Sequence, residues 1–382
     1  MDLTLILTED CNLRCRYCYQ KHFRRNSMGP ETGIKAVAAA LEHDANHLAL
    51  TFFGGEPLLE SETLFEILKS ARRMASDRGT TMTAKVPTNG LLLHEEIVDQ
   101  AKRHGLFVSL SFDGVRPAQD SGRVGPNGES SFDDVQRALK LLVRSRLPFA
   151  VYSVITPLNV AYLAESRRYL WEMGARIIVV AIDYTSPWTA EALEALEEQY
   201  HRVAALYERW LREKAYFQLE PFDSRISQRT RSGDWSRCCP GVGQITVAPD
   251  GTLFGCTEYF YRRLQPLGNL ETWLDPARVR EMSKERCARP EECYDCGLQD
   301  RCNNMCACVN LRTTGHANIP PDSLCVTEQL ALQAADRIAS RLFRKRVPEF
   351  LLRKYSSSYH MLTAIEKLFE SMGVDHEPVA TR

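Results

Sequence analysis

Thirteen cysteines form two groups in this sequence of 382 residues. Three lie within residues 11–18, none occurs from 19 to 237, and ten lie between 238 and 325. Cysteines of an intracellular protein are more often metal ligands than disulfide partners. We therefore expect metal or iron–sulfur chemistry at two separate centres.

The first group has the spacing Cys-x3-Cys-x2-Cys, with Cys11, Cys15 and Cys18 directly after a strand-like run. An iron–sulfur cubane has four irons, so three thiolates leave one iron open to bind and activate a ligand. The spacing alone leaves two alternatives: a zinc site completed by a residue such as His22, or three unrelated buried thiols.

The second group surrounds a predicted hairpin. Cys239-Pro-Gly leads into a run that turns at Asp250-Gly251, a tight-turn signal, and Cys256 follows on the return strand. Beyond the hairpin, residues 293–306 carry Cys-x2-Cys-x5-Cys-x3-Cys, and a last cysteine stands at 325. The pattern predicts cluster or metal ligands, and a pair of zinc ribbons is the alternative that spacing leaves open.

The cysteine-free body must position these groups, and it alternates short apolar runs with amphipathic segments. Strands are expected at Leu3–Leu7, Ala49–Phe53, Thr83–Pro87, Phe107–Ser111, Phe149–Ile155 and Ile177–Ile182. Helices are expected at Glu31–Glu42, Glu62–Arg78, Glu95–His104, Phe132–Arg144 and Leu163–Met173. Six such units predict an α/β fold, a partial (β/α)6 TIM barrel with its functional residues at the C-terminal ends of the strands.

Bulk properties narrow the location and the partners. The 48 basic and 49 acidic residues give no overall field that would attract nucleic acid or an anionic membrane. The sequence starts without signal-peptide features, and no apolar run approaches the roughly 18 residues of a membrane span. We expect a cytoplasmic protein that binds neither nucleic acid nor a membrane.

The first cysteine group resembles the signature of the radical S-adenosylmethionine (SAM) superfamily, including the aromatic Tyr17 before the last cysteine. Gly54-Gly55-Glu56-Pro57 after the second strand is similar to the SAM-methionine motif of that family. The resemblance implies that the open iron is chelated by the amino and carboxylate groups of SAM. It also implies that an electron from the cluster cleaves SAM to a 5′-deoxyadenosyl radical.

Two further strand ends carry motifs that alone would suit simple turns, Thr88-Asn89-Gly90 and Ser111-x-Asp113-Gly114. Similar enzymes hold SAM with the serine of the second motif and an arginine twelve residues later, here Ser111 and Arg123. The cofactor-binding residues that the resemblance implies are Gly54, Gly55, Glu56, Pro57, Thr88, Asn89, Ser111 and Arg123.

The second cysteine group resembles the SPASM extension of radical SAM peptide maturases, which would give three [4Fe–4S] clusters in all. By that resemblance the first auxiliary cluster is held by Cys239, Cys256 and Cys306. The second is held by Cys293, Cys296, Cys302 and Cys325. Cys238, Cys287 or an open iron remain as options for the fourth position of the first cluster, and Cys308 is expected to be a spare buried thiol.

The domain scheme follows from these assignments and from the breaker-rich stretch 221–233, which comes after a helical pattern over 190–214. We expect a radical SAM core at 1–215, a linker at 216–237, a SPASM domain at 238–327 and a helical C-terminal segment at 328–382. Auxiliary clusters can take an electron from a substrate radical, which suits a net oxidation.

The family includes peptide maturases and anaerobic sulfatase maturases, and one residue bears on the choice. The sulfatase type carries an aspartate base directly after the cysteine of Gly-x4-Cys, where this sequence has Thr257. A threonine hydroxyl is a poor base, although Glu258 is the next residue. We expect hydrogen abstraction from a peptide and a thioether or carbon–carbon crosslink or similar oxidation in ribosomally synthesised peptide maturation; formylglycine formation in sulfatases is the alternative.

The partners implied are a peptide or protein substrate and an external electron donor such as flavodoxin or ferredoxin. Only ten residues precede Cys11, so we expect a separate leader-recognition protein or binding by the C-terminal helices instead of an N-terminal leader domain. Basic residues there would receive an acidic leader, or simply form a solvated helix face: Arg341, Arg344, Lys345, Arg346, Arg353 and Lys354.

A different class of function is a non-catalytic iron–sulfur electron carrier or a zinc-ribbon binding protein. The segment Gly54–Pro57 and the β/α body argue against both, because neither needs a pocket for SAM. No catalytic residue is assigned from sequence, since Tyr17, Tyr259, Tyr261 and His316 have nothing that sets them apart from core or surface residues.

Overall fold

A computed structural model of the chain describes residues 1–20, 26–43, 46–214, 216–230, 238, 241–287, 290–302 and 306–355. His22 and Cys239 lie outside these residues, and so does the side chain of Cys287.

The described strands form one sheet in the order β11-β10-β9-β8-β1-β2-β3-β4-β5-β6-β7. They are β1 (Asp2–Thr8), β2 (His47–Gly54), β3 (Thr81–Thr88), β4 (Leu106–Ser111), β5 (Phe149–Ile155), β6 (Ile177–Ile182), β7 (Gln218–Leu219), β8 (Gln244–Val247), β9 (Thr252–Phe254), β10 (Gly268–Asn269) and β11 (Trp273–Leu274). Neighbours from β1 to β7 are parallel, as is β8 with β1, whereas β8 to β11 are antiparallel.

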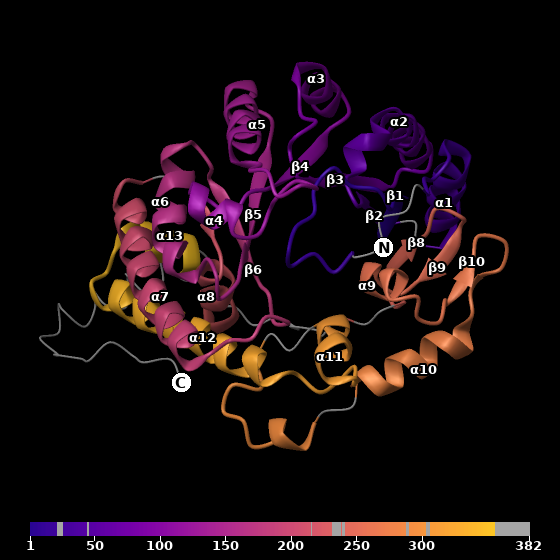
Figure 1. Cartoon of the computed structure of the whole chain (residues 1–382). Coiled ribbons are helices and arrows are strands. Elements are labelled where there is room, and N and C mark those ends of the chain that lie inside the picture. The colour runs from indigo at the N-terminus through magenta and orange to yellow at the C-terminus, as the bar shows by residue number, and fades with distance from the viewer. Residues whose placement is uncertain are drawn as a thin grey trace, which may run out of the picture.

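Helices cross over between the parallel strands, as parallel pairing requires. In the first half they are α1 (Pro30–His43), the short η1 (Pro57–Glu60), α2 (Ser61–Asp77), α3 (Glu95–Arg103), α4 (Arg116–Asp120), α5 (Phe132–Ser145), η2 (Val160–Tyr162) and α6 (Leu163–Glu172). The sheet curves into an arc with α1, α2, α3 and α5 on its outer side, while the loop after β1 crosses the inner side (Figure 1).

Alternating side chains attach the strands to these helices. In β2, Leu48, Leu50 and Phe52 are buried at every second position. On α2, Leu64, Ile67 and Leu68 are buried in the same hydrophobic core. The six strands and five helices expected of the β/α body are all present, with ends within a few residues of the predicted ones. The α/β fold with a partial barrel is therefore confirmed.

The second half of the chain contains α7 (Ala190–Arg212), α8 (Phe222–Thr230), α9 (Thr257–Tyr261), α10 (Pro276–Cys287), η3 (Glu291–Cys293), α11 (Ala307–Thr314), α12 (Asp322–Arg344) and α13 (Pro348–Tyr355). The hairpin predicted at Asp250-Gly251 joins β8 to β9, and Gly251 adopts a positive φ of 86° there. The tail helix starts earlier than expected, so Cys325 lies in the first turn of α12 instead of before it.

The sheet continues across the boundary that the sequence suggested. β8 pairs with β1 from Asp2–Gln244 to Leu5–Val247, and the segment expected as a linker includes β7 and α8. The domain scheme itself remains our proposal. None of the described helices is long and apolar enough to cross a membrane.

Candidate functional site

A cavity of about 350 Å³ opens at the C-terminal ends of the strands, on the inner side of the arc. Its wall includes the three N-terminal cysteines, the Gly-Gly-Glu segment after β2, the ends of β3 and β4, and one side of α11. The residues that line it are Cys11, Leu13, Cys15, Tyr17, Cys18, Tyr19, Gln20, Phe53, Gly54, Gly55, Glu56, Pro87, Thr88, Asn89, Ser111, Arg123, Val154, Ala181, Ile182, Asp183, Val309 and Arg312. Seven of the eight predicted cofactor residues thus meet the predicted cluster ligands in one cavity.

The eighth residue, Pro57, is buried at the start of η1 and is not part of the cavity wall. Proline suits the first position of a helix, because its missing N–H would have no partner there. Glu56 caps the same helix by accepting a hydrogen bond from the backbone N–H of Leu58 at 3.0 Å. Pro57 therefore orients Glu56 without facing the cavity.

The cysteine loop is fixed by backbone hydrogen bonds to the segment before α5. The N–H groups of Arg14 and Arg16 donate to the carbonyls of Val124 and Gly122 at 2.8 Å each. Burial raises the pKa of the Cys11 thiol to about 12 and that of Cys15 to about 11. Three thiols held together in a partly buried wall are costly to ionise unless a metal centre offsets their charge. This donor set fits a cluster ligated by three cysteines.

Glycine is required where the second motif approaches this loop. A Cβ on Gly54 would lie 2.3 Å from the carbonyl oxygen of Thr8, and one on Gly55 would lie 2.1 Å from that of Asp10. The close approach allows the N–H of Gly55 to donate to Thr8 O at 2.9 Å and that of Glu56 to Asp10 O at 2.8 Å. The motif is thereby fixed directly beside the first cysteine.

The Glu56 carboxylate is buried and accepts three hydrogen bonds. Thr88 Oγ1 donates to it at 2.8 Å, the N–H of Asn89 at 2.7 Å and the N–H of Leu58 at 3.0 Å. Burial raises its pKa to about 7, while the three donors oppose that shift. Because a carboxylate has about four lone-pair sites, one remains for a cationic ligand group such as an ammonium.

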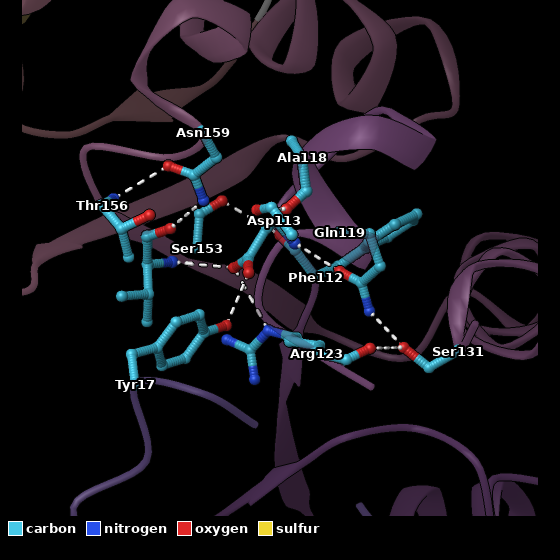
Figure 2. Close-up of polar contacts among 12 residues, drawn as sticks. Tyr17, Phe112, Asp113, Ala118, Gln119, Arg123, Ser131, Ser153, Thr156 and Asn159 are labelled. Atoms are coloured by element: carbon cyan, nitrogen blue, oxygen red, sulfur yellow. Dashed lines mark hydrogen bonds and ion pairs between the residues drawn. The ribbon is translucent and has the colours of Figure 1, made fainter. Parts of the chain in front are cut away.

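Asp113 is the centre of a buried polar network at the end of β4, and Tyr17 and Arg123 point toward it (Figure 2). Its carboxylate accepts from Tyr17 Oη at 2.5 Å and from the N–H of Val154 at 2.8 Å, and it forms an ion pair with Arg123 Nε at 3.2 Å. The guanidinium of Arg123 also lies 5.3 Å from the centre of the Tyr17 ring. Ser111 and Arg123 both line the cavity, and their role in holding SAM stays a prediction. The sequence did not indicate the central position of Asp113.

A second layer holds the backbone of this network in place (Figure 2). Gln119 Oε1 accepts from the N–H of Asp113 at 2.9 Å, and Gln119 Nε2 donates to Ser131 Oγ at 2.8 Å. Ser131 Oγ in turn donates to the carbonyl of Arg123 at 2.6 Å. Both ends of the Asp113–Arg123 pair are therefore fixed by the same buried side chains.

The first auxiliary site is described in part. Cys256 occupies the N-cap position of α9 and Cys306 that of α11, without a side-chain capping hydrogen bond, and helix dipoles favour thiolates at such positions. The Cys256 sulfur accepts hydrogen bonds from Cys308 and from the N–H of Glu258, which lower its pKa. Cys238 is partly exposed. Cys239 as a ligand remains a prediction.

The second auxiliary site is a cavity of about 300 Å³ beside the start of α12, and Cys293, Cys296, Cys302 and Cys325 all line it. Burial raises the pKa of Cys325. Glu328 also lines this cavity and forms a buried ion pair with Arg225, with Nε and Oε1 2.7 Å apart. Four thiols in one cavity fit a complete set of cluster ligands.

Within the described residues, no three His, Cys, Asp or Glu side chains are arranged to bind one metal ion. A cubane differs from such a site, because each cysteine binds its own iron.

The wall toward α11 contains residues that sequence reasoning did not find. Arg312 of α11 lies over the Tyr19 ring at 5.7 Å and pairs with Glu258 at 3.3 Å. Tyr19 Oη is 3.2 Å from the Thr257 hydroxyl. Asp183 follows β6, so its place at a strand end is a signal that could have indicated it. Arg312 carries no comparable signal.

The comparisons agree with this geometry. Residues 5–170 match the Radical SAM superfamily. An uncharacterized protein, MJ0907, of Methanocaldococcus jannaschii is 30% identical over 53% of this chain and 69% of its own. The chain belongs to the radical SAM superfamily. Members of this superfamily are enzymes that use SAM and [4Fe–4S] clusters, and so does this one.

Other relatives of this radical SAM enzyme have named activities. The radical SAM cyclopropyl synthase TigE of Paramaledivibacter caminithermalis is 22% identical over 91% of this chain and 76% of its own. The cysteine-type anaerobic sulfatase-maturating enzyme of Clostridium perfringens strain 13 is 24% identical over 78% and 85%. The enzyme is thus related both to sulfatase maturases and to peptide-modifying enzymes.

Solved structures support the fold of this radical SAM enzyme. Native anSMEcpe with bound AdoMet superimposes with a TM-score of 0.76 at 20% identity, covering 89% of this chain and 98% of that one. The same enzyme with AdoMet and a Cp18Cys peptide gives a TM-score of 0.75 at 20% identity, covering 90% and 98%.

Proposed function

We propose that this radical SAM enzyme is a peptide maturase that introduces a thioether or carbon–carbon crosslink, or a similar oxidation, into a ribosomally synthesised peptide. The observation that carries the proposal is the shared cavity: its wall combines the Cys11–Cys18 loop with α11, the helix that follows the auxiliary ligand Cys306. A substrate in this cavity lies between the SAM site and the auxiliary cysteines. Hydrogen abstraction and removal of a second electron can then occur on the same group.

Each part of the wall has its own role in the proposal. Cys11, Cys15 and Cys18 hold the SAM cluster, and Glu56 receives the SAM ammonium through its remaining lone pair. Ser111 and Arg123 hold other polar groups of SAM, with Arg123 oriented by Asp113. When bound, SAM and the cluster supply a 5′-deoxyadenosyl radical. The apolar residues Phe53, Val154 and Ile182 keep water away from it.

The residue after Cys256 favours peptide maturation over formylglycine formation. Thr257 stands where the sulfatase type has its base, and its hydroxyl meets the phenol of Tyr19, itself a weak acid whose pKa is raised by burial. The adjacent Glu258 carboxylate is paired with Arg312. Sulfatase maturation stays as the second candidate because the cysteine-type anaerobic sulfatase-maturating enzyme of Clostridium perfringens resembles this chain over most of both sequences.

The test is anaerobic coexpression of the full chain with small peptides encoded next to its gene, followed by mass spectrometry. Crosslinking predicts loss of a pair of hydrogens per modification and fragments that stay joined across the bond. A cysteine-containing sulfatase peptide serves as the control substrate, and conversion of its cysteine to an aldehyde would favour the second candidate. Formation of 5′-deoxyadenosine without any change in either peptide would contradict both.

The proposal needs two kinds of partner. A low-potential donor such as flavodoxin or ferredoxin would reduce the SAM cluster before each turnover. A separate leader-recognition protein would present the peptide if this chain does not bind the leader itself. Addition of each candidate to purified enzyme, with 5′-deoxyadenosine as the readout, would identify them.

A further inference from the structure

Cys308 does not have the surroundings of an ordinary core thiol. It is the second residue of α11 and only 2% exposed, and it packs against Ala248, Phe254 and Tyr259. Cys256 and Cys306 pack against the same apolar cluster. Three cysteines from two helix N-termini therefore meet in one buried place.

The sulfur of Cys308 contacts both neighbouring cysteines. It forms side-chain hydrogen bonds with Cys256 and with Cys306, which are two of the expected ligands of the first auxiliary cluster. A thiol that only fills space would be surrounded by carbon atoms. Here two of the nearest groups are sulfurs that carry negative charge once a cluster is bound.

We infer that Cys308 is a thiolate ligand of the first auxiliary cluster beside Cys256 and Cys306, and that it takes the fourth position that the sequence left open. The inference rests on the proposed iron–sulfur assignment of this site. Ligation breaks the S–H bond of Cys308, releases its proton to solvent and forms a sulfur–iron bond, with no change in the oxidation state of the sulfur. The first auxiliary cluster then has no open iron for substrate, so its role is electron transfer.

The geometry distinguishes Cys308 from Cys238. Cys308 packs in the same apolar cluster as Cys256 and Cys306 and lies on the helix that follows Cys306, whereas Cys238 lies before the hairpin and is not among the described residues of that cluster. The apolar residues around Cys308 also exclude water as a fourth ligand.

The experiment uses the full chain with Cys11, Cys15 and Cys18 replaced by Ala, so that only the auxiliary clusters remain. Anaerobic reconstitution with iron and sulfide should give about eight irons per chain. Adding Cys308→Ala should remove between about one and about four of them and alter the electron paramagnetic resonance spectrum of the reduced protein. The matched variants Cys238→Ala and Cys287→Ala should keep both the iron and the spectrum.

A Cys308→Ser variant tests whether loss of the cluster results from misfolding, because serine nearly preserves the volume of the side chain. Its circular dichroism should match the parent, whereas its spectrum should change, since oxygen replaces a sulfur ligand. An unchanged iron count and spectrum in Cys308→Ala would overturn the inference. A shift of the reduction potential of the cluster alone would not rescue it, because loss of a hydrogen-bond donor to a ligand sulfur would have the same effect. Loss of the cluster in Cys238→Ala or Cys287→Ala but not in Cys308→Ala would also overturn it.

The proposed function is tested separately. SAM cleavage is measured on the chain with all its cysteines, and an inactive chain with an intact first auxiliary cluster would leave the ligand assignment standing. Absence of the first auxiliary cluster from the chain with all its cysteines would overturn the assignment of Cys308 as a ligand.

Discussion

At the scale of single residues, sequence reasoning found the groups that follow local patterns. The cysteine motif, Glu56 and Ser111 are each marked by a spacing or by the end of a strand, and the structure brings all of them to one cavity. Asp113 and Arg312 act through partners about 10 to 96 residues away, and no local pattern specifies such contacts. Cys308 was expected to be spare for the same reason.

Asp113 should be important for stability as well as for SAM binding. Asp113→Asn leaves the Arg123 guanidinium buried without its counter-ion, and breaking a buried pair in this way costs about 3 kcal/mol or more. The measurement is the free energy of unfolding of the cluster-free protein in urea. Asp133→Asn is the control, because its pair with Arg116 is exposed to solvent and its loss should change stability much less. Equal stability of both variants would contradict the buried network.

Glu56 should give the cluster-free protein a specific pH dependence. Its folded pKa is raised by burial to about 7, above the ordinary value of 4.5, so the folded state retains a proton that the unfolded state has lost. Stability should therefore fall as the pH rises between these values, by at most about 1.4 kcal/mol per pH unit, and level off above pH 7.

Glu56→Gln provides the comparison for this pH dependence. The variant will be less stable overall, because its amide NH2 group faces hydrogen-bond donors. The difference in unfolding free energy between wild type and variant should nevertheless shrink from pH 5 to pH 7. Parallel curves over that range would show that Glu56 is ionised in the folded protein throughout.

At the scale of elements, the helices of the C-terminal half pair their charges with one another. Glu208 of α7 binds Arg341 at 2.8 Å and Lys345 at 3.4 Å, which attaches the end of α12 to α7. Asp223 of α8 binds Lys354 of α13 at 2.8 Å and Arg353 at 3.3 Å. Four of the six basic side chains considered for leader binding therefore already have carboxylate partners within the chain.

This pairing also shows what sequence could not provide about the elements. Periodicity predicted an apolar face on the tail helix and basic residues beside it, and both are present. The partners of those basic residues lie on α7 and α8, more than 100 residues earlier, and which face meets which depends on tertiary packing.

At the scale of the whole molecule, the core and the auxiliary half share one sheet. Leu3 and Leu5 of β1 are fully buried and pair on one side with β2 and on the other with β8, which comes about 240 residues later. Without β8, the backbone hydrogen-bonding groups on that side of β1 would form an open sheet edge. The α7–α12 contacts close the other side of the molecule.

A fragment of residues 1–215 should therefore not behave as an independent domain, although the sequence places a boundary at its end. It lacks β8 to cover β1 and α12 to cover α7, so we expect it to aggregate or to unfold without a cooperative transition. Size-exclusion chromatography and thermal unfolding, with the full chain as control, are the measurements. A monomeric fragment with a sharp transition would mean that β8 adds little to β1. The cavity would then belong to the core alone, with α11 as a removable cover instead of a structural wall.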